Sequence, residues 1–523
     1  MIEATGRAGM VTSPHYLASE AGLKVLEAGG NAIEAAIAIA AMLSVTYPHF
    51  CGLGGDAVWL VAEPGGAPTC FLGIGQAGQG TAPGGPPIPA RGAASTVTTA
   101  CAVDSWGHAL AHSQARWGGG QGLARLLEPA IVAAEAGFPV TDSQVFWLGF
   151  RKSEIAGWPG FSDLFTAEHA SRRGAIFRQP ALAGTLRAIA GNGARDFYEG
   201  ELARRIAKGL AQAGSPLTAA DLAATRTREV APAQLNYRGL TLLAPPPPTQ
   251  GVTTLMIMGI LAALDRRGVA EGSADFYHLA VEAVKQAFLG RGGIADPDFT
   301  DQPIGKWLSA DNLHRHAEAI DKQHALPWPQ PFRTGDTVFF ATTDAEGRGV
   351  SVLQSIYFDW GSGVVAGDTG VLWQNRGAAF STRPGDANAI QPGKRPFYTL
   401  NPGMALANGR PHLLYGTQGA DGQPQTLSVV LSRLIDYGMS PLKALSAPRF
   451  LLGRTFSDSR DSLKLEQDAG AAILTELAAR GHEASAIPAH SPLAGQAGVI
   501  RIAANGDLSG AHDPRSDGLA LGR

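Results

Sequence analysis

The stretch Gly335-Asp336-Thr337-Val338-Phe339-Phe340-Ala341-Thr342-Thr343-Asp344 decides the fold. Val338–Thr343 has the β-branched and aromatic composition of a strand, and Val350–Gln354 has the same character. Asp344-Ala345-Glu346-Gly347 between them is typical of a turn. The sequence therefore predicts two short strands joined by a turn, with Thr337 directly before the first. Taken alone, a threonine at that position is a structural residue.

Helical patterns predominate before this stretch, and strand patterns after it. Gly29-Gly30-Asn31 predicts a helix stop, followed by a helix over Ala32–Leu43 with Asn31 as its N-cap. Further helices are expected over Leu123–Ala136, Leu202–Ala213, Phe276–Leu289 and Gln425–Asp436. Strands are expected at Val371–Gln374, Gly403–Ala407 and His412–Tyr415. This order favours an α+β layered enzyme over a regular βαβ alternation.

Composition excludes several classes of protein. The 523 residues include 42 Lys+Arg and 45 Asp+Glu, for a formal net charge of −3, so nothing draws the chain to nucleic acid. A hydrophobic content of 45% is too high for a disordered chain. Ala32–Val45 is too short to span a bilayer, and no secretory leader is visible, so a cytoplasmic protein without membrane contact is expected.

Common catalytic and cofactor motifs are absent from the sequence. It has no phosphate-binding loop, no G-x-G-x-x-G, no G-x-S-x-G and no His-Glu-x-x-His. The three cysteines show no metal-type spacing, and we expect neither a metal nor an organic cofactor. A Ser-His-Asp hydrolase built from unmarked residues stays open. Glycine clusters at 52–55, 361–363 and 416–422 are either turns or places where the backbone approaches an oxyanion.

A series of ordered motifs nevertheless resembles the gamma-glutamyltranspeptidase family of N-terminal nucleophile hydrolases over nearly the whole chain. Before the central stretch these motifs are Gly29-Gly30-Asn31-Ala32-Ile33-Glu34-Ala35, Pro48-His49-Phe50-Cys51-Gly52-Leu53-Gly54-Gly55, Ala134-Glu135-Ala136-Gly137-Phe138, Phe197-Tyr198-x-Gly200, Leu217-Thr218-x-x-Asp221-Leu222 and Ala295-Asp296-Pro297. From it onward they are Thr337 seven residues before Asp344, Gly361-Ser362-Gly363, Lys394-Arg395-Pro396, Gly416–Ala420 and Asp513-Pro514-Arg515-x-Asp517-Gly518.

The resemblance implies a fold and a mechanism. The fold would be a four-layer αββα sandwich. Thr337 would cut the bond after Asp336, giving a large chain, 1–336, and a small chain, 337–523, that together form one αββα domain. The freed α-amino group of Thr337 would then act as the base that activates its own hydroxyl. Ser355 would orient that hydroxyl, and the backbone N–H groups of Gly419 and Ala420 would bind the oxyanion.

Departures from the family pattern concern the substrate. The arginine that grips the γ-glutamyl carboxylate aligns with Gln79, and the aspartate that holds the α-amino group aligns with Ala379. Two supporting serines align with Tyr398 and Thr399, an asparagine with Tyr357 and a glutamine with Arg376. Poor γ-glutamyl recognition is therefore expected. We expect Arg376 and Asn375 to hold a substrate carboxylate beside Tyr357, Tyr398 and Thr399; a structural salt bridge of Arg376 is the alternative.

Two segments, 374–380 and 419–425, resemble a branch that holds oxamate amidohydrolases of purine breakdown and cephalosporin acylases. The first hypothesis is a self-processing amidohydrolase that converts oxamate to oxalate and ammonia. A glutathione hydrolase or gamma-glutamyltransferase, or a glutaryl-type acylase, is the second; an unprocessed, non-catalytic binding protein is the third. The expected partners are a small carboxylate-bearing amide and the two cleavage products as a heterodimer. A dimer of these heterodimers stays open.

Overall fold

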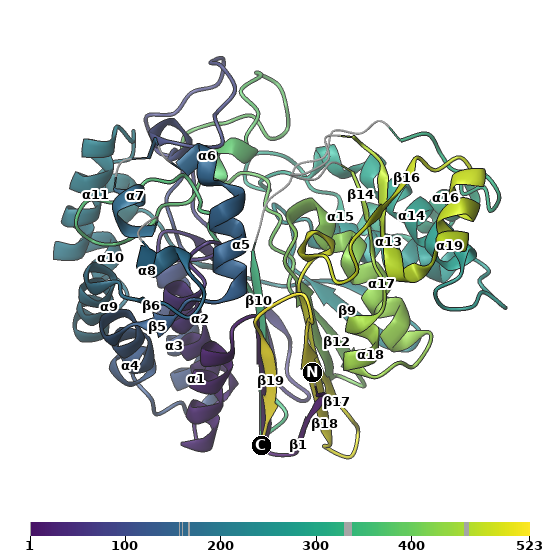
Figure 1. Cartoon of the computed structure of the whole chain (residues 1–523), viewed down its shortest axis with the longest axis horizontal. Coiled ribbons are helices and arrows are strands. Elements are labelled where there is room, and N and C mark those ends of the chain that lie inside the picture. The colour runs from purple at the N-terminus through teal and green to yellow at the C-terminus, as the bar shows by residue number, and fades with distance from the viewer. Residues whose placement is uncertain (1, 156, 159, 166–167, 329–336, 454–459) are drawn as a thin grey trace.

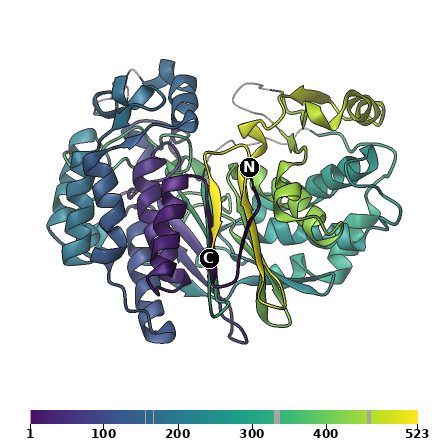
Figure 2. The same ribbon diagram turned by 60° about the horizontal axis from the view of Figure 1, so that its bottom comes forward.

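The computed structural model describes residues 2–523 except 156, 159, 166–167, 329–336 and 454–459. Two seven-stranded sheets stand face to face in the middle, and a layer of helices covers the outer face of each (Figure 1). Figure 2, turned by 60°, shows the same helix–sheet–sheet–helix order. The chain therefore has the four-layer αββα architecture of the α+β class that the resemblance implies.

One sheet carries the strand that follows Thr337. Its strands run in the order β19 (Leu519–Gly522), β2 (Gly9–Ser13), β10 (Val338–Asp344), β11 (Gly349–Ser355), β3 (Asp56–Ala62), β4 (Thr69–Gly73) and β7 (Arg228–Val230). Neighbouring strands are antiparallel, and the predicted turn joins β10 to β11 with Val338 opposite Gln354. The β-rich composition of both segments accounts for this central hairpin.

The second sheet faces the first. It consists of β1 (Ala4–Gly6), β18 (Leu508–His512), β17 (Ala497–Ile502), β13 (Arg410–Thr417), β12 (Gly403–Ala407), β9 (Leu240–Ala244) and β8 (Ala233–Tyr237). Helices predominate before Thr337 and strands after it, as the sequence patterns predict, and both parts of the chain contribute strands to both sheets. Apolar side chains such as Val58, Leu353 and Leu414 fill the space between the sheets.

The outer helices pack on one sheet each. Over the sheet with β10 lie α1 (Tyr16–Glu27), α2 (Ala32–Thr46), α3 (Ala102–Trp117), α4 (Leu123–Ala136), α9 (Pro180–Asn192) and α11 (Glu201–Ala213). Over the other lie α13 (Gly251–Ala263), α14 (Ala274–Leu289), α16 (Ala310–Glu318), α17 (Gln423–Ile435), α18 (Pro441–Ser446) and α19 (Ala471–Ala479). Every residue of α2 is buried, and Asn31 caps it in a capping box with Glu34, as its sequence predicts.

Short elements complete the fold. They are α5 (Asp142–Phe150), α6 (Lys152–Ile155), α7 (Phe161–Phe165), α8 (Glu168–Ser171), α10 (Asp196–Glu199), α12 (Ala219–Ala223), α15 (Ile304–Trp307), β5 (Phe138–Pro139), β6 (Ile176–Phe177), β14 (Phe450–Leu452), β15 (Leu463–Glu466) and β16 (Ala484–Ile487). Among the described residues, no helix combines the length and the apolar composition that crossing a bilayer requires.

One predicted strand is wrong. Val371–Gln374 makes only isolated bridges, Leu372 with Val365 and Trp373 with Gly54. Its backbone groups bond instead within the surrounding loops, as when Trp373 N–H donates to the Val364 carbonyl. The apolar side chains of this loop are buried, and a run of buried apolar residues looks like a strand in the sequence.

Candidate active site

Thr337 and Ser355 face each other at the open end of the β10–β11 hairpin. The register that pairs Val338 with Gln354 places Thr337 directly opposite Ser355. The Thr337 hydroxyl donates to Ser355 Oγ at 3.3 Å, and both side chains are 1% exposed. Ser355 Oγ also accepts the Tyr357 N–H at 2.8 Å. The hairpin thus brings the predicted nucleophile and its predicted orienting hydroxyl together, away from bulk water.

The predicted oxyanion-binding loop follows β13 of the opposite sheet. Gly419 has φ 121° and Ala420 has φ 43°, which is a left-handed conformation rare for a residue with a side chain. Neither backbone N–H donates a hydrogen bond to any residue that the structure describes. Gln250 fixes the loop, because its Nε2 donates to the carbonyls of Ala420 at 2.7 Å and Thr399 at 2.9 Å. Two adjacent free N–H groups can stabilise a tetrahedral oxyanion.

Sequence reasoning missed Gln423, the first residue of α17. Its side chain is fully buried, and its Nε2 lies 3.5 Å from Thr337 Oγ1. Gln423 Oε1 has no hydrogen-bond partner in the described part of the chain. A buried amide oxygen without a donor is costly, so Gln423 Oε1 could accept a hydrogen bond from a group that enters the site. Its position after the glycine-rich loop is the only sequence signal that could have identified it.

Arg376 is a buried cation with unsatisfied donors. Its Cζ lies 3.7 Å from the ring centre of Tyr357 and 4.5 Å from that of Tyr398. Nη2 donates to Thr399 Oγ1 at 3.3 Å, whereas Nε and Nη1 have no acceptor among the described residues. Burial lowers the pKa of Arg376, partly offset by Tyr357, Tyr398 and two carboxylates. Four of the five predicted substrate-binding residues therefore form one cluster, whose guanidinium could bind an anion.

The structure disfavours the salt-bridge alternative for Arg376. This guanidinium forms no ion pair with any acidic residue in the described ranges. Asp421, which contributes to its field, is paired with Arg291 at 2.9 Å. An arginine that stays charged and lacks a carboxylate inside the protein leaves room for one on a ligand.

Asn375 has a different placement from the one expected. Its Oδ1 accepts the Phe358 N–H at 3.0 Å, and its Nδ2 donates to the Ala90 carbonyl at 2.5 Å. Both ends of this amide are therefore used on the backbone. The geometry makes Asn375 a support of the loop that carries Tyr357, which itself has φ 79°. Its predicted contact with a substrate carboxylate stays a prediction.

A cavity of about 470 Å³ borders this cluster. Its walls include Tyr357, Ala379 and Asp421, together with the aromatic residues Phe288, Trp328 and Phe397. Arg291 stacks on Phe288 there, with 4.3 Å between its Cζ and the ring centre. Asp336, the predicted residue before the cleavage point, lies outside the described residues.

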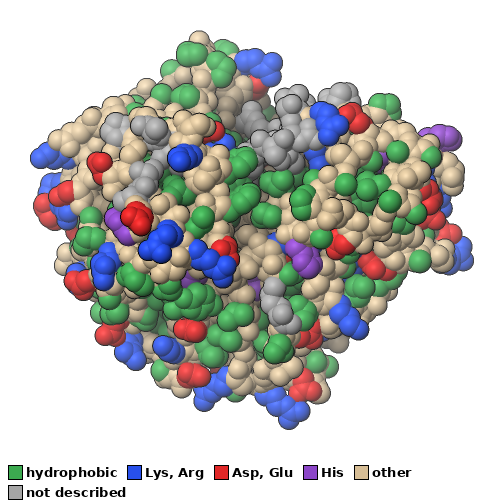
Figure 3. Space-filling view, viewed as in Figure 1, with side chains coloured by type: hydrophobic (Ala, Val, Ile, Leu, Met, Phe, Trp, Pro, Cys, Tyr) green, Lys and Arg blue, Asp and Glu red, His purple; other side chains and the backbone are tan. Residues whose placement is uncertain are grey.

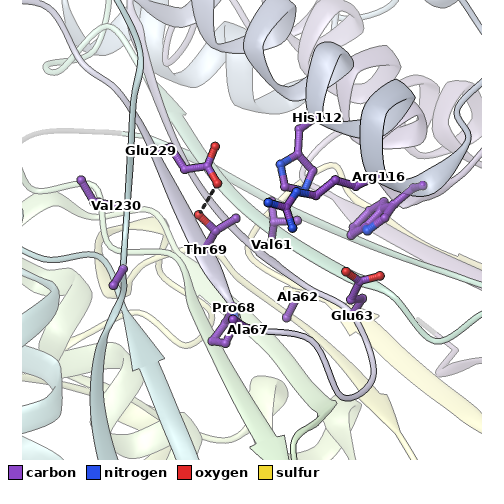
Figure 4. A pocket seen from close by; sticks show the side chains of 12 residues that line it. Val61, Ala62, Glu63, Ala67, Pro68, Thr69, His112, Arg116, Glu229 and Val230 are labelled. Atoms are coloured by element: carbon purple, nitrogen blue, oxygen red, sulfur yellow. Dashed lines mark hydrogen bonds between the residues drawn. The ribbon is translucent and has the colours of Figure 1, made fainter.

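A second cavity has no connection with the predicted residues (Figure 4). It measures about 310 Å³ and lies between β3, β4, β7 and α3. Glu229 accepts a hydrogen bond from Thr69 Oγ1 at 3.2 Å, and His112 and Arg116 reach over it. None of the predicted site residues lines it.

On the face shown in Figure 3, side chains of both charge signs are interspersed, which matches the near-neutral net charge.

His278, Glu282 and His482 are the one group of described residues that could hold a metal ion by proximity. Their side chains already have partners inside the protein: His278 Nδ1 is 2.8 Å from His482 Nε2, and Glu282 is 2.7 Å from Lys285 Nζ. An ammonium group on the carboxylate opposes a cation there. We read the group as a polar core cluster.

Comparisons with known proteins identify the family of the chain. The family model described as gamma-glutamyltranspeptidase matches residues 18–522. The chain is 44% identical, over 98% of both chains, to a protein of Klebsiella pneumoniae named oxamate amidohydrolase proenzyme. It is 40% identical, over 99% of both chains, to the glutathione hydrolase-like YwrD proenzyme of Bacillus subtilis. The crystal structure of cephalosporin acylase from Bacillus halodurans superposes with a TM-score of 0.90 at 32% identity, covering 100% of this chain and 97% of that one. The chain therefore belongs to the gamma-glutamyltranspeptidase family of N-terminal nucleophile hydrolases, and it is an enzyme of that family.

Proposed function

We propose that this enzyme hydrolyses oxamate to oxalate and ammonia. The observation that carries the proposal is Arg376, a buried cation whose Nε and Nη1 have no acceptor among the described residues. It stacks on Tyr357, whose N–H donates to Ser355 Oγ. In oxamate the carboxylate is bonded directly to the carbon of the scissile amide, so an arginine that holds this carboxylate also fixes the amide carbon. The name of the Klebsiella pneumoniae relative supports the same substrate.

The proposed enzyme first processes itself. Thr337 Oγ attacks the carbonyl carbon of Asp336, the peptide C–N bond breaks, and the nitrogen becomes the α-amine of Thr337. Water then hydrolyses the ester and leaves a carboxylate on Asp336. Two chains, 1–336 and 337–523, result, and they stay together because both contribute strands to both sheets. The names of two relatives as proenzymes support this step.

Turnover then uses the same hydroxyl. The α-amine accepts the hydroxyl proton as Oγ bonds to the amide carbon of oxamate, and the N–H groups of Gly419 and Ala420 receive the negative charge on oxygen. The proton passes to the leaving nitrogen, the C–N bond breaks, and ammonia departs. Water attacks the remaining oxalyl ester and releases oxalate. Arg376, between Tyr357 and Tyr398, holds the substrate carboxylate throughout. That the enzyme acts in the cytoplasm and in purine breakdown remains a prediction.

A glutaryl-type acylase with the same machinery is the second candidate. The cavity of about 470 Å³ beside Tyr357 favours it, because oxamate needs only a small part of that space. A glutathione hydrolase has less support, since Gln79 and Ala379 replace the charged residues that the family uses for a γ-glutamyl group.

Ammonia release from oxamate by the purified protein tests the proposal, with Thr337→Ala protein alongside. We expect two chains on a denaturing gel and ammonia release for the wild type, and one chain with no release for the variant. Thr337→Ser, which keeps a hydroxyl, should retain both reactions at reduced rates. A wild-type protein that is cut but leaves oxamate intact would refute the substrate and direct attention to glutaryl and γ-glutamyl anilides. An uncut wild type would support the binding protein instead.

A further inference from the structure

Asp56 is a buried carboxylate that the sequence pattern does not single out. It is the first residue of β3, directly opposite Ser355 in the pairing with β11, and is 1% exposed. Its Oδ1 accepts the N–H groups of Gly75 and Cys101, each at 2.9 Å. Its Oδ2 accepts the Tyr398 hydroxyl at 2.7 Å. One side chain therefore joins the nucleophile sheet to two loops and to the ring that lies on Arg376.

Tyr398 links this carboxylate to the cation. Its ring centre lies 4.5 Å from Arg376 Cζ, and its hydroxyl points to Asp56. The tyrosine backbone is held as well, because its N–H donates to the Pro248 carbonyl and its carbonyl accepts the Gln250 N–H. A carboxylate and a guanidinium separated by one ring, both out of water, affect each other strongly.

The other described groups around Asp56 are either uncharged or already paired with another residue. Burial holds the pKa of the Cys101 thiol and of the Tyr398 phenol well above their ordinary values, so both are neutral. Gln374 is an uncharged amide. Asp421, on the far side of Arg376, is paired with Arg291. Burial raises the pKa of Asp56 to about 6, against the lowering effect of its hydrogen bonds.

We propose that Asp56 positions Tyr398 against Arg376 and, by its own charge, sets how tightly the cluster binds a small carboxylate. The inference rests on the proposed function only in taking Arg376 as the anion site. An ionised Asp56 weakens the attraction of Arg376 for an anion, and a protonated Asp56 leaves the full positive charge. Affinity for the substrate carboxylate therefore rises as the pH falls through the pKa of Asp56.

Asp56→Asn tests this with little change of shape. The asparagine oxygen can still accept both N–H groups, while the charge is lost. We expect KM for oxamate at pH 7.5 to fall by about tenfold. In the wild type KM should fall between pH 7.5 and 5, and in Asp56→Asn it should be flat. Asp344→Asn is the matched control: that carboxylate is also buried and accepts the Ala32 N–H at 3.1 Å, but it does not contact Tyr398. Its KM should match the wild type.

A folded, cut Asp56→Asn enzyme with unchanged KM and unchanged pH dependence would reduce Asp56 to a structural tie and overturn the proposal. Should that variant fail to fold, Tyr398→Phe keeps the ring and removes the hydrogen bond that favours ionised Asp56. Its KM should change at a higher pH than in the wild type, and an unchanged midpoint would equally overturn the proposal.

Calorimetric binding of oxalate separates this inference from the proposed function. If the cut wild type binds oxalate but does not hydrolyse oxamate, the proposed reaction fails. The Asp56 comparison is then made on the oxalate Kd, with the same tenfold difference expected. If it binds no oxalate between pH 5 and 7.5, the cluster is no anion site, and the Asp56 proposal falls with it.

Discussion

At the scale of single residues, Arg376 makes the sharpest distinction between substrates. Hydrogen bonds to charged groups contribute about 1.5–3 kcal/mol each, equivalent to roughly 10- to 150-fold in affinity. Arg376→Met fills similar space without the charge. We expect it to raise KM for oxamate by about that factor, with a smaller change in kcat, as measured by steady-state ammonia release.

Oxamide, the uncharged diamide, is the control substrate for Arg376→Met. Because oxamide has no carboxylate, its kcat/KM should be the same in the variant and the wild type. For oxamate, the kcat/KM of Arg376→Lys should lie between the values of Arg376→Met and the wild type. An ammonium keeps the charge but cannot stack between Tyr357 and Tyr398 as a guanidinium does. Equal losses for oxamate and oxamide would mean that Arg376 acts by packing rather than by its charge.

At the scale of elements, close contact between the two sheets positions the nucleophile strand. Phe339, two residues after Thr337, lies against Gly416 of β13 and Gly498 of β17. A Cβ on Gly416 would lie 2.1 Å from Phe339 Cδ2. Gly416→Val should therefore displace the ring, lower the free energy of unfolding by about 1–3 kcal/mol and slow self-cleavage. Urea unfolding in the Thr337→Ala background, and the rate of chain cleavage in the native background, measure the two effects.

Gly191→Ala in α9 is the matched control, because nothing lies within 4 Å of a Cβ there. Alanine is the better helix former, so stability should stay equal or rise slightly, and cleavage should proceed at the wild-type rate. A Gly416→Val protein as stable as the Gly191→Ala protein would show that the sheets separate easily at this point.

Periodicity and caps predicted most elements because those signals are local. The helix over Leu123–Ala136 and the strand over Gly403–Ala407 begin and end as expected, and Asn31 caps α2. The meeting of Thr337 with Ser355 follows from the register of one hairpin. Gln250 reaches the site from a segment far from the predicted residues, so no spacing could reveal it. Gln423 and Asp56 directly follow predicted glycine-rich motifs, but only the packed structure brings them to Thr337 and Tyr398. The strand predicted at Val371–Gln374 was wrong because a buried loop has the same run of apolar residues as a buried strand.

At the scale of the whole molecule, one polar contact between the two sheets involves an uncharged histidine. His512 of β18 lies with its Nδ1 2.9 Å from Thr12 Oγ1 of β2, in the opposite sheet. Burial lowers the pKa of His512 to about 3, and that of His15 and His482 to about 3 as well. These side chains stay neutral in the folded protein at a pH where they are charged in the unfolded chain, whose histidines titrate near 6.5.

The sign of the pH effect follows from proton uptake. Between about pH 6.5 and 3 the unfolded chain binds a proton at His512 and the folded chain does not, so the free energy of unfolding falls as the pH falls, by about 1.4 kcal/mol per pH unit for each such histidine. His512→Gln keeps a side chain that can bond Thr12 and cannot be protonated. In uncut Thr337→Ala protein, we expect His512→Gln to decrease the slope between pH 6 and 4.5 by about that amount. A slope equal to that of the parent Thr337→Ala protein would place water beside His512 and remove it from the sealed interface between the sheets.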